Sequence, residues 1–293
     1  GSKRGTRTGC HSAWQHGQVM DQVDGGTSNE LPDAPCVVLC DLDGVIWLAH
    51  QPIPGSVGAI AALRAAGHRV LFVTNNSAAR VEAQEASLLE LGIPSAGDVL
   101  TSANAAALLI EPGERVLVCG GEGVVQAVVG RGAVVVEHDA EHADAVVVGF
   151  HRTFDYEEML HASRAVRNGA RLIGTNDDAT YPTPDGPIPG GGAILASIVT
   201  ASGSLPIVAG KPHEPMAALI RATIGQAAAR LAVMVGDRPE TDGLMASTLG
   251  CRYAHVESGV TAPGAPVVPM PDLTAPDLAG VAKVLIAKGF DRR

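Results

Sequence analysis

The stretch VVLCDLDGVIWL, residues 37–48, places Asp41 and Asp43 at the exit of an otherwise apolar run. A short apolar run that ends in a turn is typical of a strand buried inside a parallel sheet. Two carboxylates one residue apart at such a place need a counter-charge, or different surroundings, to keep their charges apart. The stretch therefore predicts a buried strand whose carboxyl end carries chemistry.

Working outward, short β-rich runs alternate with runs rich in Ala and Leu from residue 36 onward. The first of them are VVLC at 37–40, GAIAALRAAG at 58–67, RVLFVT at 69–74 and EAQEASLLELG at 82–92. This alternation is typical of βαβ units and predicts an α/β fold with a doubly wound parallel sheet. Because ligands of such sheets bind outside the carboxyl ends of the strands, the polar residues that follow the strands are the candidate site residues.

Four predicted strand ends carry such residues: CDLDGV at 40–45, FVTNNS at 72–77, VAGKPHEP at 208–215 and VMVGDRPETD at 233–242. Thr74 follows Asp41 by 33 residues and Asp237 follows Lys211 by 26, each about one βα repeat. The 137 residues between Thr74 and Lys211 are too many for a single connection. One further βα unit near 98–110 accounts for a part of them.

The rest of that gap has strands and helices of its own, with the strand-like runs RVLVCG, AVVVEH, AVVVGF and RLIGTN. We therefore expect residues 113–207 to form an inserted α/β domain. The main domain would then consist of residues 35–112 and 208–293. Residues 1–34 are polar and lack an apolar period, which indicates a flexible tail.

If the four strand ends meet at one sheet edge, Asp41, Asp43, Asp237 and Asp242 converge there. A divalent cation would neutralise them, and a set of oxygen ligands suits Mg²⁺ better than zinc. A phosphate bound to that ion would be complemented by a cation and a hydroxyl group, here Lys211 and Thr74. Of the four lysines in the chain, Lys211 alone lies far from the termini.

Taken together, DLDGV, TNNS, GKP and GDRPETD resemble the four motifs of the haloacid dehalogenase (HAD) superfamily. The resemblance covers about residues 36–261 and implies a Rossmann-like core. The insertion between the second and third motifs is similar to the large α/β cap of one phosphatase subgroup. The stretch GTNDDATYPTPDGPIPGGGA at 174–193 is similar to the cap pattern of that subgroup.

The resemblance implies a role for each motif residue. Asp41 would be the nucleophile that forms an aspartyl-phosphate, and Asp43 the acid and base. Mg²⁺ would be held by Asp41, the Asp43 backbone carbonyl and Asp237, with Asp242 orienting a metal-bound water or Lys211. The residues expected at the phosphoryl group or the substrate are Thr74, Asn75, Asn76, Lys211 and, from the cap, Asn176 and Asp178.

The acid at position 43 favours phosphatases and phosphomutases over dehalogenases and P-type ATPases. The expected reaction is Mg²⁺-dependent hydrolysis of a small phosphomonoester, with glycerol 3-phosphate and 2-phosphoglycolate as leading substrates by resemblance. Two alternatives stay open, a phosphomutase acting on a sugar phosphate and a receiver-like phospho-switch without turnover. Caps of this subgroup often take part in dimerisation, so the resemblance also leaves a homodimer open.

Composition excludes several other classes of protein. The net charge of −10 and the lack of a basic run argue against a nucleic-acid or membrane-surface partner. No apolar run is long enough for a membrane span. Five scattered cysteines without C-x-x-C spacing argue against disulfides and zinc sites, and favour a reducing cytoplasm.

Three further patterns permit a structural interpretation. The run VLVCGGEGVVQAV at 116–128 lacks the third glycine of a dinucleotide-binding motif and is predicted to be a tight strand-to-helix turn. His151 and Arg152 follow a cap strand and are weaker candidates for substrate contact. His213 and Glu214 are expected to begin the helix after Pro212.

Overall fold

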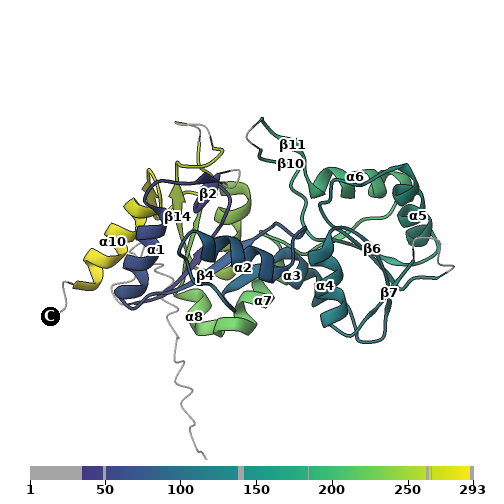
Figure 1. Ribbon diagram of the computed structural model, residues 1–293, viewed down its shortest axis with the longest axis horizontal. Helices are drawn as coiled ribbons and strands as arrows, with labels where there is room; N and C mark the ends of the chain where they lie inside the picture. Colours follow the sequence, from purple (N-terminus) through teal and green to yellow (C-terminus); the bar gives the residue numbers. More distant parts are fainter. Residues whose placement is uncertain are drawn as a thin grey trace, which may run out of the picture.

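The computed structural model describes residues 35–48, 51–137, 142–183, 185–261, 264 and 266–290. The predicted flexible tail, residues 1–34, lies outside the described residues. Two parallel sheets dominate these ranges, one built from segments at both ends of the chain and one from the middle (Figure 1). The predicted α/β fold with a second α/β unit is confirmed.

The larger sheet has six strands in the order β15-β14-β13-β1-β4-β5. All five pairings are parallel, and Cys40 at the end of β1 lies beside Val235 and Phe72. The strands are β15 (Leu273–Ala275), β14 (Arg252–Val256), β13 (Val233–Gly236), β1 (Val37–Cys40), β4 (Arg69–Thr74) and β5 (Val99–Thr101). Strands from both ends of the sequence therefore end at the same edge of this sheet.

Both faces of this sheet are buried, which is why its strands are apolar throughout rather than alternating. One face packs against α1 (Ser56–Ala65), α2 (Val81–Glu90) and α10 (Leu278–Phe290). The other packs against α3 (Ser102–Ala107), α7 (Glu214–Ile224), α8 (Gln226–Arg230) and α9 (Leu244–Leu249). The predicted βα unit near 98–110 is β5 with α3.

The second sheet has five parallel strands in the order β12-β9-β8-β6-β7. They are β12 (Ile207–Val208), β9 (Arg171–Gly174), β8 (Ala145–Val148), β6 (Arg115–Cys119) and β7 (Val134–Val136). The helices α5 (Tyr156–Arg167) and α6 (Gly191–Ser202) pack on one face, and α4 (Glu122–Gly130) packs on the other beside α3. Figure 1 shows this unit to the right of the larger sheet.

One expectation about connectivity is wrong. The strand before Lys211 was expected in the larger sheet, but β12 pairs with β9 of the second sheet. The predicted boundary between residues 207 and 208 therefore falls inside a strand, because a two-residue run carries no signal that tells one sheet from another. The division into domains otherwise stays a prediction.

Short elements complete the described part. Two antiparallel pairs are β2 (Trp47–Leu48) with β3 (Gln51–Pro52) and β10 (Thr180–Tyr181) with β11 (Ile188–Pro189). A π-helical turn, η1 (Pro239–Gly243), leads into α9. None of the described helices combines the length and the apolar character that crossing a bilayer requires.

Two predicted turns agree with the structure. Helix α4 begins directly after β6 and the Gly120-Gly121 turn, so residues 116–128 form the predicted strand-to-helix turn. Helix α7 begins at Glu214 with His213 as its N-cap. Residues 74–77 do not cap a helix, because α2 begins only at Val81.

Candidate active site

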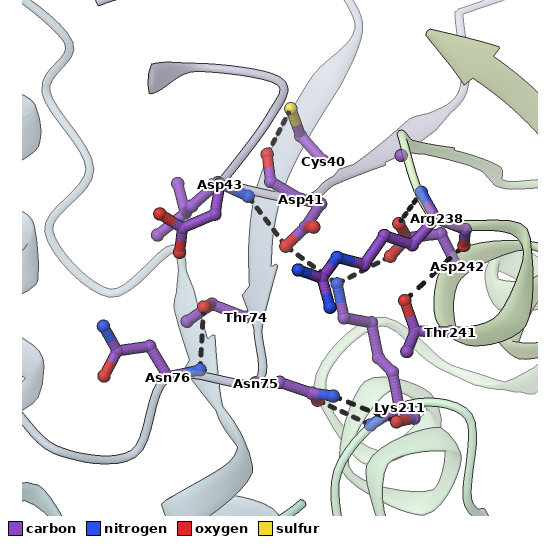
Figure 2. A network of polar contacts seen from close by, with 12 residues as sticks. Cys40, Asp41, Asp43, Thr74, Asn75, Asn76, Lys211, Arg238, Thr241 and Asp242 are labelled. Atoms are coloured by element: carbon purple, nitrogen blue, oxygen red, sulfur yellow. Dashed lines mark hydrogen bonds and ion pairs between the residues drawn. The ribbon is translucent and has the colours of Figure 1, made fainter. Parts of the chain in front are cut away.

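The centre of the site is the ammonium of Lys211, which lies between two carboxylates. Its Nζ atom is 2.8 Å from Asp41 Oδ1 and 2.7 Å from Asp242 Oδ1, and Figure 2 shows all three side chains converging. Asp41 directly follows β1, and its backbone N–H donates to Val235 O in β13. Asp41 and Lys211, which are 170 residues apart in the sequence, thus meet at the carboxyl edge of the larger sheet.

Lys211 is buried, with 1% of its surface exposed. Burial alone would lower the pKa of its ammonium, but the nearby Asp242 and Asp41 carboxylates outweigh that effect and raise the pKa. Burial, Asp41 and Asp237 raise the pKa of Asp242, while the Lys211 ammonium opposes the rise. Lys211 is therefore a permanent positive charge in the pocket.

Asp237 is the pocket carboxylate with a buried oxygen that accepts no hydrogen bond. Its Oδ2 atom accepts a hydrogen bond from Val260 N at 2.8 Å, but its buried Oδ1 atom has no hydrogen-bond partner. Burial and then Asp41 raise the pKa of Asp237 to about 6. A buried carboxylate oxygen without a donor is costly unless a cation or a proton satisfies it.

Two glycines allow the backbone to approach Asp237 closely. A Cβ at Gly259 would lie 1.9 Å from Asp237 Oδ2, and a Cβ at Gly44 would lie 2.5 Å from its Cγ atom. Gly44 also has a φ of +85°, which favours glycine. The sequence analysis singled out neither glycine, although the Asp-Gly pair at 43–44 was a usable signal.

The residues present fit a divalent cation. Oxygen atoms of Asp41, Asp237 and Asp242 lie within 4.8 Å of one another, and all three residues are buried. Both oxygens of Asp242 have donors, Lys211 Nζ and Arg238 N, whereas Oδ1 of Asp237 has none. Asp237 and Asp41 are accordingly the better placed ligands, and hard carboxylate oxygens suit Mg²⁺ or Ca²⁺.

Asp43 has surroundings different from those of Asp41. Its Oδ1 atom accepts a hydrogen bond from Trp47 Nε1 at 3.1 Å. Desolvation and the neighbouring Asp41 charge raise the pKa of Asp43 to about 7. Asp43 can therefore carry a proton at neutral pH, as a catalytic acid must.

Thr74, the last residue of β4, presents a hydroxyl group to the pocket. Thr74 Oγ1 accepts a hydrogen bond from Asn76 N at 3.0 Å, which leaves its own hydrogen available for donation. Asn76 Oδ1 accepts from Ala78 N, so the loop after β4 is held by its own side chains. Thr74 and Asn76 both line the pocket.

Asn75 ties the larger sheet to the second unit. Its side-chain Oδ1 accepts from Lys211 N at 2.8 Å, and its Nδ2 donates to Lys211 O at 3.0 Å and to Asp178 Oδ2 at 3.1 Å. Its backbone oxygen accepts from Asn176 Nδ2 at 2.8 Å. The side chain of Asn75 is thus occupied by structural contacts, and so is the amide of Asn176.

The pocket is formed by both units. The acidic residues and Thr74 lie on one side, and Phe150, Asn176, Asp178, Thr180, Tyr181, Gly190 and Gly191 lie on the other. Phe150 and Tyr181 stack with ring centroids 5.1 Å apart. Their stacked pair gives the second unit an apolar wall next to its polar residues.

Arg238 is a pocket residue that the sequence analysis missed. It lines the pocket beside Lys211. Burial would lower the pKa of its guanidinium, but the acidic neighbours, first Asp178 and then Asp237, outweigh that effect and raise the pKa. The arginine within GDRPETD was a signal for it, but nothing local tells a pocket arginine from an exposed one. Tyr181 and Phe150 were missed for the same reason, and His151 and Arg152 are not among the residues lining the pocket.

Known proteins resemble this chain along most of its length. Residues 38–133 match a family model described as haloacid dehalogenase-like hydrolase, and residues 208–289 match a second one described as HAD hydrolase-like. A D-glycerol 3-phosphate phosphatase of Mycobacterium tuberculosis is 38% identical over 76% of this chain. The match spans only 63% of that enzyme's length.

Two further relatives extend the comparison. An acid sugar phosphatase of Staphylococcus saprophyticus is 36% identical, with 76% of this chain and 86% of that protein covered. A crystal structure of a glycerol phosphate phosphatase from M. tuberculosis in complex with magnesium has a TM-score of 0.75 at 34% identity. It covers 86% of this chain and 78% of that one, and another structure of that phosphatase contains calcium.

Proposed function

Because this chain belongs to the haloacid dehalogenase-like hydrolases, as a phosphoric monoester hydrolase of their cap-containing subgroup, we propose that it hydrolyses small phosphomonoesters through an aspartyl-phosphate on Asp41. The observation that carries the proposal is the contact of Lys211 Nζ with both Asp41 and Asp242, next to the unsatisfied Oδ1 of Asp237. The charge of the Asp41 carboxylate would repel a dianionic phosphate. The Lys211 ammonium beside it offsets that repulsion, so the carboxylate can attack.

In the first step, a carboxylate oxygen of Asp41 forms a bond to phosphorus while the bond from phosphorus to the alcohol oxygen breaks. Asp43 gives its proton to the departing oxygen, as its pKa of about 7 allows at neutral pH. Lys211 and the Thr74 hydroxyl stabilise the charge on the phosphoryl oxygens. The products of this step are the free alcohol and phosphorylated Asp41.

In the second step, the ionised Asp43 takes a proton from water as the water oxygen attacks phosphorus. The bond between phosphorus and Asp41 breaks, and inorganic phosphate leaves with the original carboxylate restored. We propose that Asp41, Asp237 and the Asp43 backbone carbonyl hold Mg²⁺, with Asp242 orienting Lys211 or a metal-bound water. When bound, such an ion supplies charge neutralisation and orients the phosphate.

For substrates, we propose glycerol 3-phosphate first and 2-phosphoglycolate second. Support comes from the relatives named glycerol phosphate phosphatase and acid sugar phosphatase and from the polar groups that line the second unit's side of the pocket. Asn75 and Asn76 after β4, together with Asn176 and Asp178 of the second unit, would shape the pocket, and the substrate hydroxyls would meet Asp178. The stacked Phe150 and Tyr181 would limit the length of the substrate.

The test is a phosphate-release assay with p-nitrophenyl phosphate and a panel of small phosphometabolites, with and without Mg²⁺. We expect Asp41→Asn and Asp43→Asn each to lower kcat by at least about 100-fold, and chelation of Mg²⁺ to stop turnover. The matched control is Asp98→Asn, which alters an aspartate paired with Arg64 away from the pocket and should leave kcat unchanged. Turnover close to that of the wild type in the Asp41 variant would overturn the proposal.

The same assay separates the alternatives. A phosphomutase would return the phosphoryl group to the sugar and yield an isomerised product instead of free phosphate. A receiver-like switch would yield a stable phosphoprotein without turnover. One experiment that traces the phosphoryl group to free phosphate, to an isomerised sugar phosphate or to the protein would distinguish the three reactions.

Two accompanying expectations also remain proposals. A cytoplasmic location is supported by Cys36, Cys40, Cys119 and Cys251, which are free thiols within the described part of the chain. A homodimer is to be tested by light scattering on the full chain, where a mass near 29.9 kDa would contradict it.

A further inference from the structure

A second group of ligand-type side chains lies in the second unit, apart from the acidic residues of the pocket. Cys119, His151 and Glu158 offer a thiol, an imidazole and a carboxylate whose ligand atoms all lie within 4.8 Å of one another. His151 Nε2 is 3.9 Å from Cys119 Sγ and 3.4 Å from Glu158 Oε1. Cys119 is fully buried, and the side chains of His151 and Glu158 are each 10% exposed.

The backbone holds these three residues in place. Cys119 is the last residue of β6, and Gly149 N, just after β8, donates to its backbone oxygen at 2.8 Å. His151 follows two residues later. Glu158 lies in the first turn of α5, whose N-cap Asp155 accepts a hydrogen bond from Glu158 N at 2.9 Å. The carboxyl edge of the sheet and the start of a helix therefore present the three groups to a common point.

The spacing of the ligand atoms matches that of a small tetrahedral ion. With Zn–S near 2.3 Å and Zn–N or Zn–O near 2.0–2.1 Å, neighbouring ligand atoms of a tetrahedral zinc site are roughly 3.3–3.6 Å apart. The distance from His151 to Glu158 already has this value, and that from His151 to Cys119 exceeds it by a few tenths of an ångström. The remaining distance, from Cys119 Sγ to the Glu158 carboxylate, is below 4.8 Å.

The second nitrogen of the histidine ring has a partner that would orient it. His151 Nδ1 is 3.2 Å from Thr153 Oγ1. If Nδ1 donates its hydrogen to that hydroxyl oxygen, Nε2 carries the lone pair and faces Cys119 and Glu158. Such outer contacts are what fix the tautomer and orientation of metal-binding histidines.

We propose that Cys119, His151 and Glu158 form a binding site for a borderline divalent transition-metal ion of the Zn²⁺ class, with solvent as its fourth ligand. The thiolate and carboxylate charges balance the two charges of the ion, and the soft thiolate selects against Mg²⁺. On binding, the thiol hydrogen of Cys119 leaves as a proton and the sulfur lone pair forms the bond to the metal. Neither oxidation nor reduction occurs.

Without a metal, the same groups form a hydrogen-bonded cluster. Burial and then Glu158 raise the pKa of the Cys119 thiol, so the thiol is protonated. The ion would bind next to the pocket wall, because Phe150, which stacks on Tyr181, precedes His151 in the chain. The bound ion would thus hold the loop between β8 and α5 that carries this wall.

The test uses Co²⁺ as a spectroscopic probe on the full chain, stripped of metals with EDTA and returned to buffer containing Mg²⁺. We expect one equivalent of Co²⁺ to produce a thiolate-to-metal charge-transfer band and the intense visible bands of a tetrahedral site, both displaced by Zn²⁺. Co²⁺ at the carboxylates of Asp41 and Asp237 would produce no thiolate band, so failure of the proposed phosphatase function would not affect this readout.

The variants separate this site from the other thiols. Cys119→Ser should abolish the charge-transfer band, whereas Cys10→Ser and Cys251→Ser should keep it. Because a serine at the buried position 119 could affect folding, Glu158→Gln provides a second arm and should weaken Zn²⁺ binding by about 10-fold or more. A full chain without the band, or a band that persists in Cys119→Ser, would overturn the proposal.

Discussion

The buried carboxylates of the pocket lower the stability of the folded protein. Asp43, Asp237 and Asp242 all have raised pKa values, chiefly because burial penalises their charged forms. Lys211 neutralises only part of this negative charge, and Asp237 Oδ1 has no donor at all. An arrangement of this kind is retained where it serves catalysis, since it costs stability whenever the cation is missing.

The first prediction follows from the pKa of Asp237, which burial raises from 3.8 to about 6. The folded protein holds this proton more tightly than the unfolded chain, so the stabilising contribution is complete below pH 3.8 and is lost as pH rises through about 6. In EDTA at pH 8, Asp237→Asn should therefore be more stable than the wild type by about 1–3 kcal/mol. The advantage should shrink as the pH falls toward 4.

Urea denaturation at pH 5 and pH 8 measures the free energy of unfolding of the wild type and of Asp237→Asn. Mg²⁺ should stabilise the wild type but not the variant. The control is Asp98→Asn, where a partly exposed ion pair is lost and a change within about 0.5 kcal/mol is expected. If Asp237→Asn were the less stable protein at pH 8 without metal, the account of an unsatisfied buried charge would be wrong.

At the scale of elements, helix α4 begins against the loop that carries Thr74 and Asn76. Gly123 N donates to Ala78 O at 3.1 Å, and a Cβ at Gly123 would lie 2.2 Å from Ala79 O. A Cβ at Gly121 would likewise lie 2.4 Å from Ala78 O, so Gly121 and Gly123, the two glycines of the incomplete dinucleotide motif, allow a close approach of helix and loop. The helix start of the second unit positions the loop that is expected to bind the phosphoryl group.

The second prediction concerns this contact. Gly123→Ala should destabilise the protein by about 1–3 kcal/mol through overpacking, and it should lower kcat because the loop must shift. Gly130→Ala at the end of the same helix is the matched control, since nothing lies within 4 Å of the added methyl group. Thermal unfolding and a steady-state assay measure both effects, and equal melting temperatures for the two variants would contradict the prediction.

At the scale of the whole molecule, the site exists only where the two sheets meet. Asn75 joins them through its contacts with Lys211, Asn176 and Asp178. The apolar cluster around α3 and α4 continues across the junction, so the two units share part of a core. The position of the second unit over the acidic residues is thus determined by both polar and apolar contacts.

The third prediction removes the polar connection. Asn75→Ala should lower the free energy of unfolding by about 2–4 kcal/mol, because several partners lose hydrogen bonds at once. It should also raise KM for small substrates, since Asp178 is no longer held at the pocket. The control, Asn104→Ala, loses the capping box of α3 and should cost about 1 kcal/mol without a change in KM. An unchanged KM in Asn75→Ala would show that this connection does not position the second unit.

The fold class and the polar strand ends could be predicted from local patterns in the sequence. Local rules suffice for these features: apolar runs and helical periods specify the elements. Asp41 and Asp237 directly follow strands of the larger sheet, and Thr74 is the last residue of one. The proximity of Asp41, Lys211 and Asp242 was also expected, on the assumption that parallel strands end at one edge. The assumption failed for the strand before Lys211, which belongs to the other sheet, but the Lys211 ammonium still contacts Asp41 and Asp242.

How side chains far apart in sequence share their partners could be seen only in the folded chain. The pairing of β12 with β9, the several contacts of Asn75, the place of Arg238 in the pocket and the group formed by Cys119, His151 and Glu158 all depend on it. The physical reason is that strand pairing and core packing bring these groups together over separations at which local sequence carries no signal. Burial and charge at each site then follow from the neighbours that the fold supplies.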